Sequence, residues 1–201
     1  MGLTAVADDQ LATVVTTLEM RERPRPRPLP ASRLRLVRWA APAPDKYRAL
    51  FQRVGAPWLW YSRLTLDDAA LIAATHRPET QVHAVVDPAG IEVGLLELTH
   101  PQPDRCSLDY FGLVPALTGQ GHGGWLMALA MQLAWTPGVR FVRVNTCTLD
   151  HPRALGFYRA QGFVAIRRTV ETFPDPRVLE LLPADAAPQI PLLAPRATSA
   201  R

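Results

Sequence analysis

Hydrophobic and polar positions alternate along several segments of the chain, which is the pattern of β-strands with one face in a core. The alternation is cleanest in residues 139–146 (VRFVRVNT). Alternation or enrichment in β-branched residues predicts further strands at 10–20, 33–39, 81–87, 91–99, 106–114, 163–173 and 177–182. Short turns separate the three strands between residues 81 and 114, and this spacing favours an antiparallel meander.

A spacing of three to four residues between apolar positions predicts helices in other segments. The apolar residues between Pro44 and Gly55 follow an i, i+3, i+4, i+7 spacing. A second helix is expected to begin at Thr65, whose hydroxyl can cap it, and two more are expected at 122–136 and 152–161. Together these elements indicate an α/β (α+β) domain with a mixed, mostly antiparallel sheet of about seven strands and flanking helices.

The composition fits one globular domain. The chain has 201 residues, of which 48 % are hydrophobic and 20 % are charged. The net charge of +4 comes from one segment, because residues 21–38 hold seven arginines and one glutamate (+6) and the rest of the chain sums to −2. Prolines at positions 24, 26, 28 and 30 make this segment an extended surface loop. One proline-broken arginine loop argues against a nucleic-acid-binding face.

The sequence also disfavours a metal site and a membrane segment. Cys106 and Cys147 cannot form a disulfide framework or, by themselves, a zinc site, and the five histidines lack ligand-like spacing. The N-terminus has no basic stretch before an apolar one, and the longest apolar stretch, 125–135, is about half a membrane span. We therefore expect a cytoplasmic protein without metal, in which residues 183–201 form a disordered tail.

A glycine cluster lies between a predicted strand and a predicted helix. Four glycines fall within six positions of the segment Thr118-Gly-Gln-Gly-His-Gly-Gly. Glycine allows positive φ angles and lets a ligand approach the main chain, and amide groups at a helix N-terminus attract anions such as pyrophosphate. The segment is not a P-loop, since no Gly-Lys-Ser/Thr follows. It lacks the acidic residue of a dinucleotide-binding fingerprint, because none occurs between Asp109 and Asp150.

The glycine cluster resembles the acyl-CoA-binding loop of the GNAT superfamily of N-acetyltransferases, Arg/Gln-x-x-Gly-x-Gly/Ala, with Thr118 at the place of the arginine or glutamine. A second segment, Asp150-His-Pro-Arg-Ala-Leu-Gly-Phe-Tyr158-Arg-Ala-Gln-Gly-Phe, is similar to the family's Asn-x-x-Ala-x-x-x-Tyr-x-x-x-Gly-Phe helix. Tyr-Phe-Gly-Leu and Thr-Cys-Thr-Leu-Asp-His-Pro resemble one bacterial branch. The resemblance covers residues 45–182, with 1–44 adding N-terminal strands and the Pro/Arg-rich loop to the same domain.

The resemblance implies direct acetyl transfer from acetyl-CoA to an amine, without a metal. It implies a V-shaped splay between the two central strands, 106–114 and 139–146. Pantetheine would pair with the main chain of residues 111–113, pyrophosphate would bind residues 119–124, and a backbone N–H near Leu113 would polarise the thioester. The cofactor-binding residues expected on this basis are Phe111, Gly112, Leu113, Thr118, Gly119, Gln120, Gly121, His122, Gly123, Gly124 and His151.

The same resemblance implies catalytic roles for three residues. Tyr158 would protonate the departing CoA thiolate, since a tyrosine and a thiol have comparable pKa values. The acceptor amine is an ammonium at pH 7 and must lose a proton, for which Asp109 and Glu97 are the candidate bases. Core packing for Tyr158, and a structural strand carboxylate for Asp109, stay open as alternatives. His151 could instead cap the second-motif helix or pack near the mouth of the site.

Other functions remain compatible with the sequence. The same scaffold could transfer a longer acyl group, because pocket volume sets the acyl length. A CoA-binding module without catalysis is a second alternative, since Thr118 lacks the positive charge of the family arginine. The expected partner is an amine substrate, either a small molecule or a protein amine, with no nucleic acid and no membrane, and a homodimer stays open.

Overall fold

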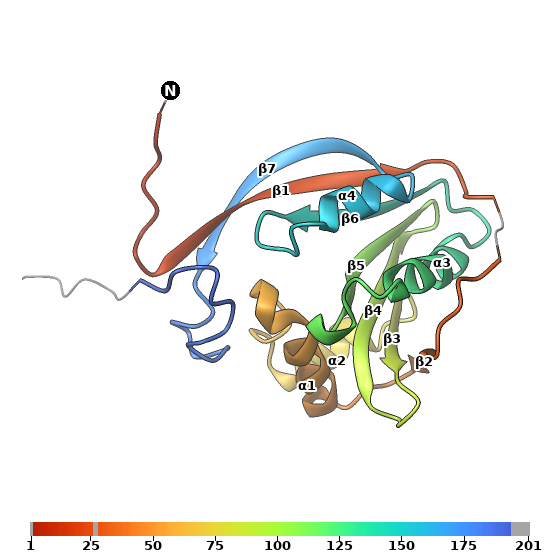
Figure 1. The fold of residues 1–201 in the computed structure, drawn as a ribbon, viewed down its shortest axis with the longest axis horizontal. Coiled ribbons are helices and arrows are strands. Elements are labelled where there is room, and N and C mark those ends of the chain that lie inside the picture. Colours follow the sequence, from red (N-terminus) through yellow and green to blue (C-terminus); the bar gives the residue numbers. More distant parts are fainter. Residues whose placement is uncertain (1, 26–27, 194–201) are drawn as a thin grey trace, which may run out of the picture.

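The computed structural model describes residues 2–25 and 28–193, and its core is one seven-stranded sheet in the order β2-β3-β4-β5-β6-β1-β7 (Figure 1). All neighbouring strands are antiparallel except β5 and β6. The strands are β1 (Gln10–Met20), β2 (Arg35–Trp39), β3 (Thr80–Val86), β4 (Glu92–Gln102), β5 (Arg105–Leu113), β6 (Phe141–Cys147) and β7 (Val164–Pro174). The helices are α1 (Pro44–Gly55), α2 (Asp68–Thr75), α3 (His122–Ala134) and α4 (Ala154–Ala160), with short 3-10 turns η1 (Ala56–Trp58) and η2 (Pro115–Leu117).

The helices cover both faces of the sheet. Leu96 and Leu98 of β4 face the side on which α3 packs through Trp125 and Leu126. Leu95, one position away, faces α1 and α2 on the other side. Because successive strand residues point to opposite faces, β4 is buried on both sides, which explains why adjacent leucines stand in it. The predicted fold class, with its mixed and mostly antiparallel sheet, is confirmed.

The N-terminal strand lies inside the sheet. β1 pairs along its whole length with β7 and, through residues 15–20, with β6 (Figure 1). Leu18 and Met20 at its end are buried in the core beneath α3 and α4. The first and the last strand of the chain therefore pair within one sheet, and β1 separates β6 from β7.

Two predicted elements differ from the structure. The second helix begins at Asp68, because the side chain of Asp67, rather than that of Thr65, accepts from a first-turn amide, the N–H of Ala70, at 2.7 Å. The Thr65 hydroxyl donates instead to the carbonyl of Ser62. Residues 177–182 form turns rather than a closing strand.

The prediction of a disordered tail from residue 183 is wrong for residues 183–193. This segment folds back onto the domain, where Ala187 is buried and packs against Leu59. The sequence suggested disorder because the segment is rich in proline and small residues, and its partners come from distant parts of the chain. The rest of the predicted tail, 194–201, and residues 26–27 of the Pro/Arg-rich loop lie outside the described residues.

The parts of the Pro/Arg-rich loop that the structure describes, 21–25 and 28–34, contain no helix or strand, as the alternating prolines predict. Arg21 forms an ion pair with the buried carboxylate of Glu19, which Arg143 also contacts. In the portion of the chain that the structure describes, no helix has the length and apolarity needed to cross a membrane.

Candidate active site

The two central strands separate halfway along their length. β5 and β6 pair only through residues 105–108 and 141–144. Beyond Leu108 and Val144 the strands diverge, and residues 109–113 and 145–147 line opposite walls of a cavity of about 1000 Å³. This divergence is the V-shaped splay that the sequence predicted.

A β-bulge in β5 lies at the point of divergence. Tyr110 pairs with Glu97 of β4, whereas Leu108 pairs with Leu98, so Asp109 is an extra residue in β5. Such a bulge bends a strand and increases its twist. It also resets the alternation of side chains. Strict alternation would place residues 109 and 111 on one face of the strand, whereas Phe111 packs in the same core as Leu108.

The cavity collects most of the residues that the sequence singled out. Two of the three candidate catalytic residues, Asp109 and Tyr158, line it, whereas Glu97 does not. Gln120 and His122 also lie outside its lining. The expected cofactor-binding residues that line it are Phe111, Gly112, Leu113, Thr118, Gly119, Gly121, Gly123, Gly124 and His151.

The glycine loop enters α3 through two residues with left-handed backbone. Gly119 has φ 83° and Gly121, the N-cap of α3, has φ 84°, values that residues with side chains rarely adopt. The N–H of Gly124 donates to the Gly121 carbonyl at 3.1 Å, and the preceding amides of a helix N-terminus are the ones that can bind an anion. The guanidinium of Arg153 lies beside this loop, with Nη2 3.4 Å from where a Cβ of residue 119 would stand.

Arg153 was not among the residues predicted from the sequence. Of the described residues that line the cavity, it is the only arginine or lysine. It follows His151 in the second motif and lies just before α4, so the signal was its place in that motif. Its backbone N–H donates to Nδ1 of His151 at 3.1 Å, which fixes the start of α4 next to the glycine loop.

Gly112 lines the cavity and also allows side chains to pack closely on β5. A Cβ at this position would lie 2.7 Å from Cγ1 of Val54 and 3.1 Å from Cη2 of Trp60. Real Cβ atoms do not tolerate the first distance, so glycine allows α1 and Trp60 to pack directly on β5. The sequence assigned this glycine to the cofactor alone, and the structure adds this close approach of side chains.

Tyr158 presents one edge to the cavity and is otherwise enclosed. Its side chain is only 7 % exposed and packs edge-on against Phe111 and Phe163. Burial, together with the negative charge of Asp150, raises the pKa of Tyr158 well above its usual value. The phenol is protonated at neutral pH, as a proton donor must be, and the raised pKa makes it a weaker acid than a free tyrosine.

Asp150 connects the strand end to the second motif, a role that the sequence analysis missed. Its carboxylate accepts hydrogen bonds from the Thr146 hydroxyl at 2.8 Å and the Cys147 N–H at 2.9 Å. Its other oxygen accepts from Trp60 Nε1 at 3.4 Å, across the cavity wall. These bonds hold the end of β6 and an aromatic side chain from the opposite half in one arrangement.

Asp109 is the carboxylate at the bend of β5. It accepts a hydrogen bond of 2.5 Å from the hydroxyl of Thr99. Burial of the carboxyl raises the pKa of Asp109 above its usual value, although Thr99 and Arg63 act in the opposite direction. Glu171, which the sequence analysis did not single out, lines the same cavity from β7.

Glu97 has a different environment. Its side chain is fully buried and lies between Arg63, with which it forms an ion pair, and the Tyr47 hydroxyl, which donates at 2.5 Å. Burial raises the pKa of Glu97, and the contacts with Arg63 and Tyr47 partly counter this rise. This network gives Glu97 a structural role, so Asp109 is the candidate base that reaches the cavity.

Some histidines and tryptophans near the site line the cavity, and some of them also pack against other rings. The His151 ring lies edge-on against Trp58, with centroids 5.2 Å apart, and both residues line the cavity. Trp60 lines the cavity and also packs against Phe51. Nδ1 of His122 lies 3.1 Å from the Ser32 hydroxyl, away from the cavity lining.

Among the described residues, no group of three or more His, Cys, Asp or Glu could hold a metal ion. The groups that line the cavity include the glycine loop, the Asp109 carboxylate and the Tyr158 phenol.

A family model described as the acetyltransferase (GNAT) family matches residues 37–163, well over half of the chain. The chain belongs to this family. Proteins of this family transfer acyl groups and use acyl-CoA as co-substrate. The match runs from β2 through α4 and includes both sequence motifs, whereas β1 and β7 lie outside it.

Solved structures of other GNAT proteins show the same fold. A GCN5-related N-acetyltransferase from Sphaerobacter thermophilus has a TM-score of 0.57 and 13 % identity, over 81 % of this chain and 52 % of that one. A tandem GNAT protein from the clavulanic acid biosynthesis pathway has a TM-score of 0.55 and 21 % identity, over 81 % and 53 %. An acetyltransferase from Thermus thermophilus has a TM-score of 0.51 and 18 % identity, over 71 % and 97 %.

At these identities the likeness concerns the fold alone. The chain spans about half the length of the first two structures. No curated protein matches the sequence.

Proposed function

We propose that this GNAT chain transfers an acetyl group from acetyl-CoA to a primary amine by direct attack. One observation carries the proposal: the cavity that opens where β5 and β6 diverge is lined by the glycine loop, Asp109 and Tyr158 together. An anion-binding loop, a carboxylate and a protonated phenol are the three groups that the reaction needs.

Asp109 and Tyr158 act at different steps of the transfer reaction. Asp109 accepts the proton of the acceptor ammonium, and the free amine nitrogen then attacks the thioester carbonyl carbon. When the tetrahedral intermediate collapses, the carbon–sulfur bond breaks and the electron pair leaves with sulfur. Tyr158 donates its phenolic proton to the thiolate, since a phenol is protonated at neutral pH. The nitrogen loses its second proton to solvent, and Asp109 and Tyr158 return to their starting protonation states through solvent. The products are an N-acetylated amine, CoA and one proton.

The phosphate groups of acetyl-CoA would bind at the loop that leads into α3. Thr118 offers no charge there, and the exposed guanidinium of Arg153 beside Gly119 supplies one. The missing charge at Thr118 was the main reason to consider a non-catalytic family member. The positive charge that is absent from the loop is present on the neighbouring segment, which supports a catalytic protein instead.

The acceptor is proposed to be a cationic amine. Away from the glycine loop the cavity is lined by the carboxylates of Asp109 and Glu171 and by aromatic side chains, among them Trp58 and Tyr61. Carboxylates attract an ammonium group, and aromatic faces pack on its alkyl chain or interact with its charge.

The proposal is tested by release of free thiol from acetyl-, propionyl- and butyryl-CoA, each combined with a panel of primary amines that includes polyamines, arylalkylamines and lysine peptides. The expected result is amine-dependent thiol release that is fastest with acetyl-CoA. Faster release from the longer donors would reassign the acyl group. Thermal stabilisation by CoA without thiol release from any combination would favour the non-catalytic CoA-binding module.

A further inference from the structure

Residues 175–193, called here the C-terminal strap, leave β7 and pack on residues 56–64, called here the wall loop. Leu182 and Ala187 of the strap form a buried apolar cluster with Leu59 of the wall loop. The Gln189 side chain donates to the Pro57 carbonyl at 2.8 Å. The strap is therefore attached to the wall loop by apolar packing and by a hydrogen bond from a side chain to a backbone carbonyl.

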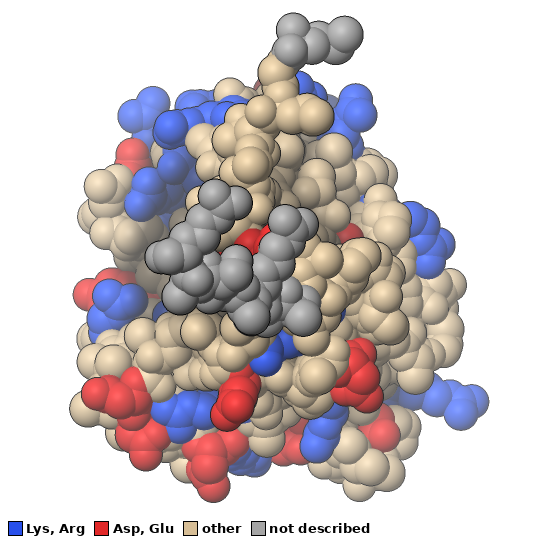
Figure 2. All heavy atoms as spheres, turned by 90° about the vertical axis from the view of Figure 1, so that its left-hand side faces the viewer, with Lys and Arg blue, Asp and Glu red and all other residues tan. Residues whose placement is uncertain are grey.

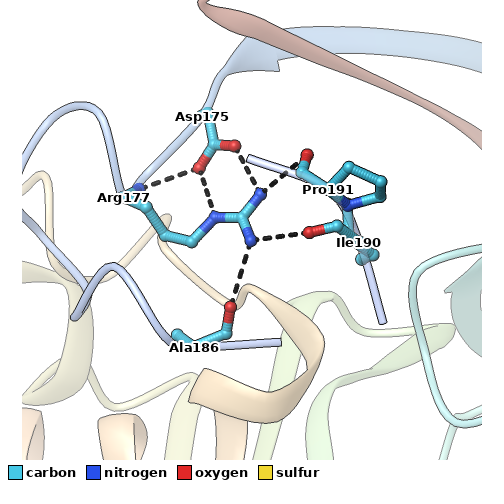
Figure 3. Close-up of polar contacts among 5 residues, drawn as sticks. All are labelled: Asp175, Arg177, Ala186, Ile190 and Pro191. Atoms are coloured by element: carbon cyan, nitrogen blue, oxygen red, sulfur yellow. Dashed lines mark hydrogen bonds and ion pairs between the residues drawn. The ribbon is translucent and has the colours of Figure 1, made fainter. Parts of the chain in front are cut away.

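One arginine holds the strap in its folded path. Arg177 is almost fully buried and faces Asp175, which accepts from Nε at 3.0 Å and from Nη2 at 2.7 Å (Figure 3). The same guanidinium donates to the carbonyls of Ala186 at 3.1 Å, Ile190 at 2.8 Å and Pro191 at 3.5 Å (Figure 3). It thus joins the end of β7 to three points of the strap, and these carbonyls have no helix or sheet partner to replace it.

The strap is not held mainly by surface charge. In Figure 2 the side of the molecule that carries the strap faces the viewer. Charged side chains of both signs gather along the lower part of this face. Apolar packing attaches the strap to the domain, and the internal Asp175–Arg177 pair holds the fold of the strap itself.

Backbone strain gathers at the same contact. Among the described residues, three that are not glycine have a positive φ: Leu59 at 55°, Glu180 at 56° and Ala187 at 51°. One lies in the wall loop and two lie in the strap, and Leu59 and Ala187 touch in one cluster. Residues in this conformation persist only where the surrounding structure holds them, and they are common at functional sites.

The wall loop forms one side of the cavity. Leu59 is flanked by Trp58 and Trp60, and both line the cavity, as does Tyr61. The Tyr61 ring stacks on Phe173 of β7, with centroids 4.7 Å apart and planes 11° from parallel. Phe173 lies two residues before Asp175. The contacts of Arg177 with Asp175 and the strap therefore hold the chain next to Phe173, and the strap packs on the loop that carries Tyr61.

We propose that Arg177 is a positioning residue for the acceptor, because it locks the strap that fixes the wall loop against β7 and so sets the shape of the acceptor side of the cavity. The proposal rests on the proposed function for the identity of that side. Its physical content, that the strap orders residues 56–64, can be measured without any substrate.

The test compares Arg177→Met with the wild type and with Arg168→Met, a control at an exposed arginine of β7 outside the cavity lining. Hydrogen–deuterium exchange of the free proteins is expected to speed up at least about tenfold in residues 56–64 of Arg177→Met and to stay unchanged in residues 110–124. For the best amine of the panel, KM is expected to rise at least about fivefold, because ordering the wall loop now opposes binding. The Kd for acetyl-CoA is expected to change less than twofold.

A second pair of variants leaves Arg177 intact and serves if Arg177→Met does not fold. Ala187→Gly suits the positive φ and is expected to keep the wild-type exchange and KM. Ala187→Val adds a branched side chain at the same strained position and is expected to reproduce the effect of Arg177→Met.

Unchanged exchange in residues 56–64 of both Arg177→Met and Ala187→Val would overturn the inference, and so would equal losses in acceptor KM and acetyl-CoA binding. A wild type that acetylates no amine would refute the proposed function, and the exchange comparison would then decide the inference alone.

Discussion

Replacing Arg153 by glutamine removes the positive charge beside the glycine loop and keeps most of the side chain's length. Nη2 of Arg153 lies 3.4 Å from the Cβ position of residue 119, which places the guanidinium within reach of a phosphate bound on the loop. A shielded hydrogen bond between charged groups contributes about 1.5–3 kcal/mol. Arg153 is exposed, so solvent screening lowers the expected loss to about 1 kcal/mol.

A loss of about 1 kcal/mol corresponds to an increase of about fivefold in the Kd for acetyl-CoA. Isothermal titration calorimetry at low and high salt measures it. Because the contact is between charges, the wild-type Kd is expected to rise more steeply with salt than the Kd of Arg153→Gln. The value of kcat is expected to stay within twofold, since the charge acts on a part of the co-substrate that does not react.

A rescue variant and a control sharpen this test. Thr118→Arg in the Arg153→Gln background places an arginine at the loop position where the family usually carries one, and it is expected to recover most of the affinity. Arg159→Gln removes an exposed arginine of α4 that does not line the cavity, and it is expected to bind acetyl-CoA as the wild type does. Equal effects of Arg153→Gln and Arg159→Gln, or no effect of either, would refute the role of Arg153.

Four further predictions concern the site and its support. Tyr158→Phe is expected to lower kcat about 10²–10⁴-fold with little change in melting temperature or acetyl-CoA affinity, and turnover retained within threefold would instead indicate a packing role. Asp109→Asn is expected to lower the rate about 10²-fold at neutral pH and less at alkaline pH. Because burial raises the pKa of Asp109, the wild-type rate should fall with decreasing pH at a value above the usual 3.8, and a pH-independent loss in the variant would contradict this assignment. Gly121→Asp is expected to abolish thermal stabilisation by CoA, because it adds bulk, backbone strain and negative charge at the anion loop, and a preserved shift would move the phosphate site elsewhere. Arg63→Met leaves the Glu97 carboxylate buried without its cation, so urea unfolding should show a loss of about 3–5 kcal/mol, and a loss under about 1 kcal/mol would mean that Glu97 is neutral in the fold.

Local signals were enough for the elements and for the two motifs of the site. The glycines at 119 and 121 have positive φ angles, as a glycine-rich turn before a helix suggests, and the alternation in 139–146 marks the strand beside it. Spacing also placed Tyr158 on a helix after that strand. These features depend on neighbours within a few residues, so the sequence alone determines them.

Only the tertiary structure decided which residues meet across long separations. The bulge at Asp109 depends on the register between β4 and β5, and one extra residue reverses every later side chain of the strand. Three further features join segments that are far apart in the sequence or separated by an intervening element. They are the position of β1 between β6 and β7, the fully buried setting of Glu97, and the approach of Arg153 to Gly119. The C-terminal strap shows the same limit, because its proline-rich sequence lacks a local signal and its order comes from Arg177 and from the distant Leu59. A pattern along the chain specifies which face of an element is apolar, whereas the partner of that face is selected by the packing of the whole domain.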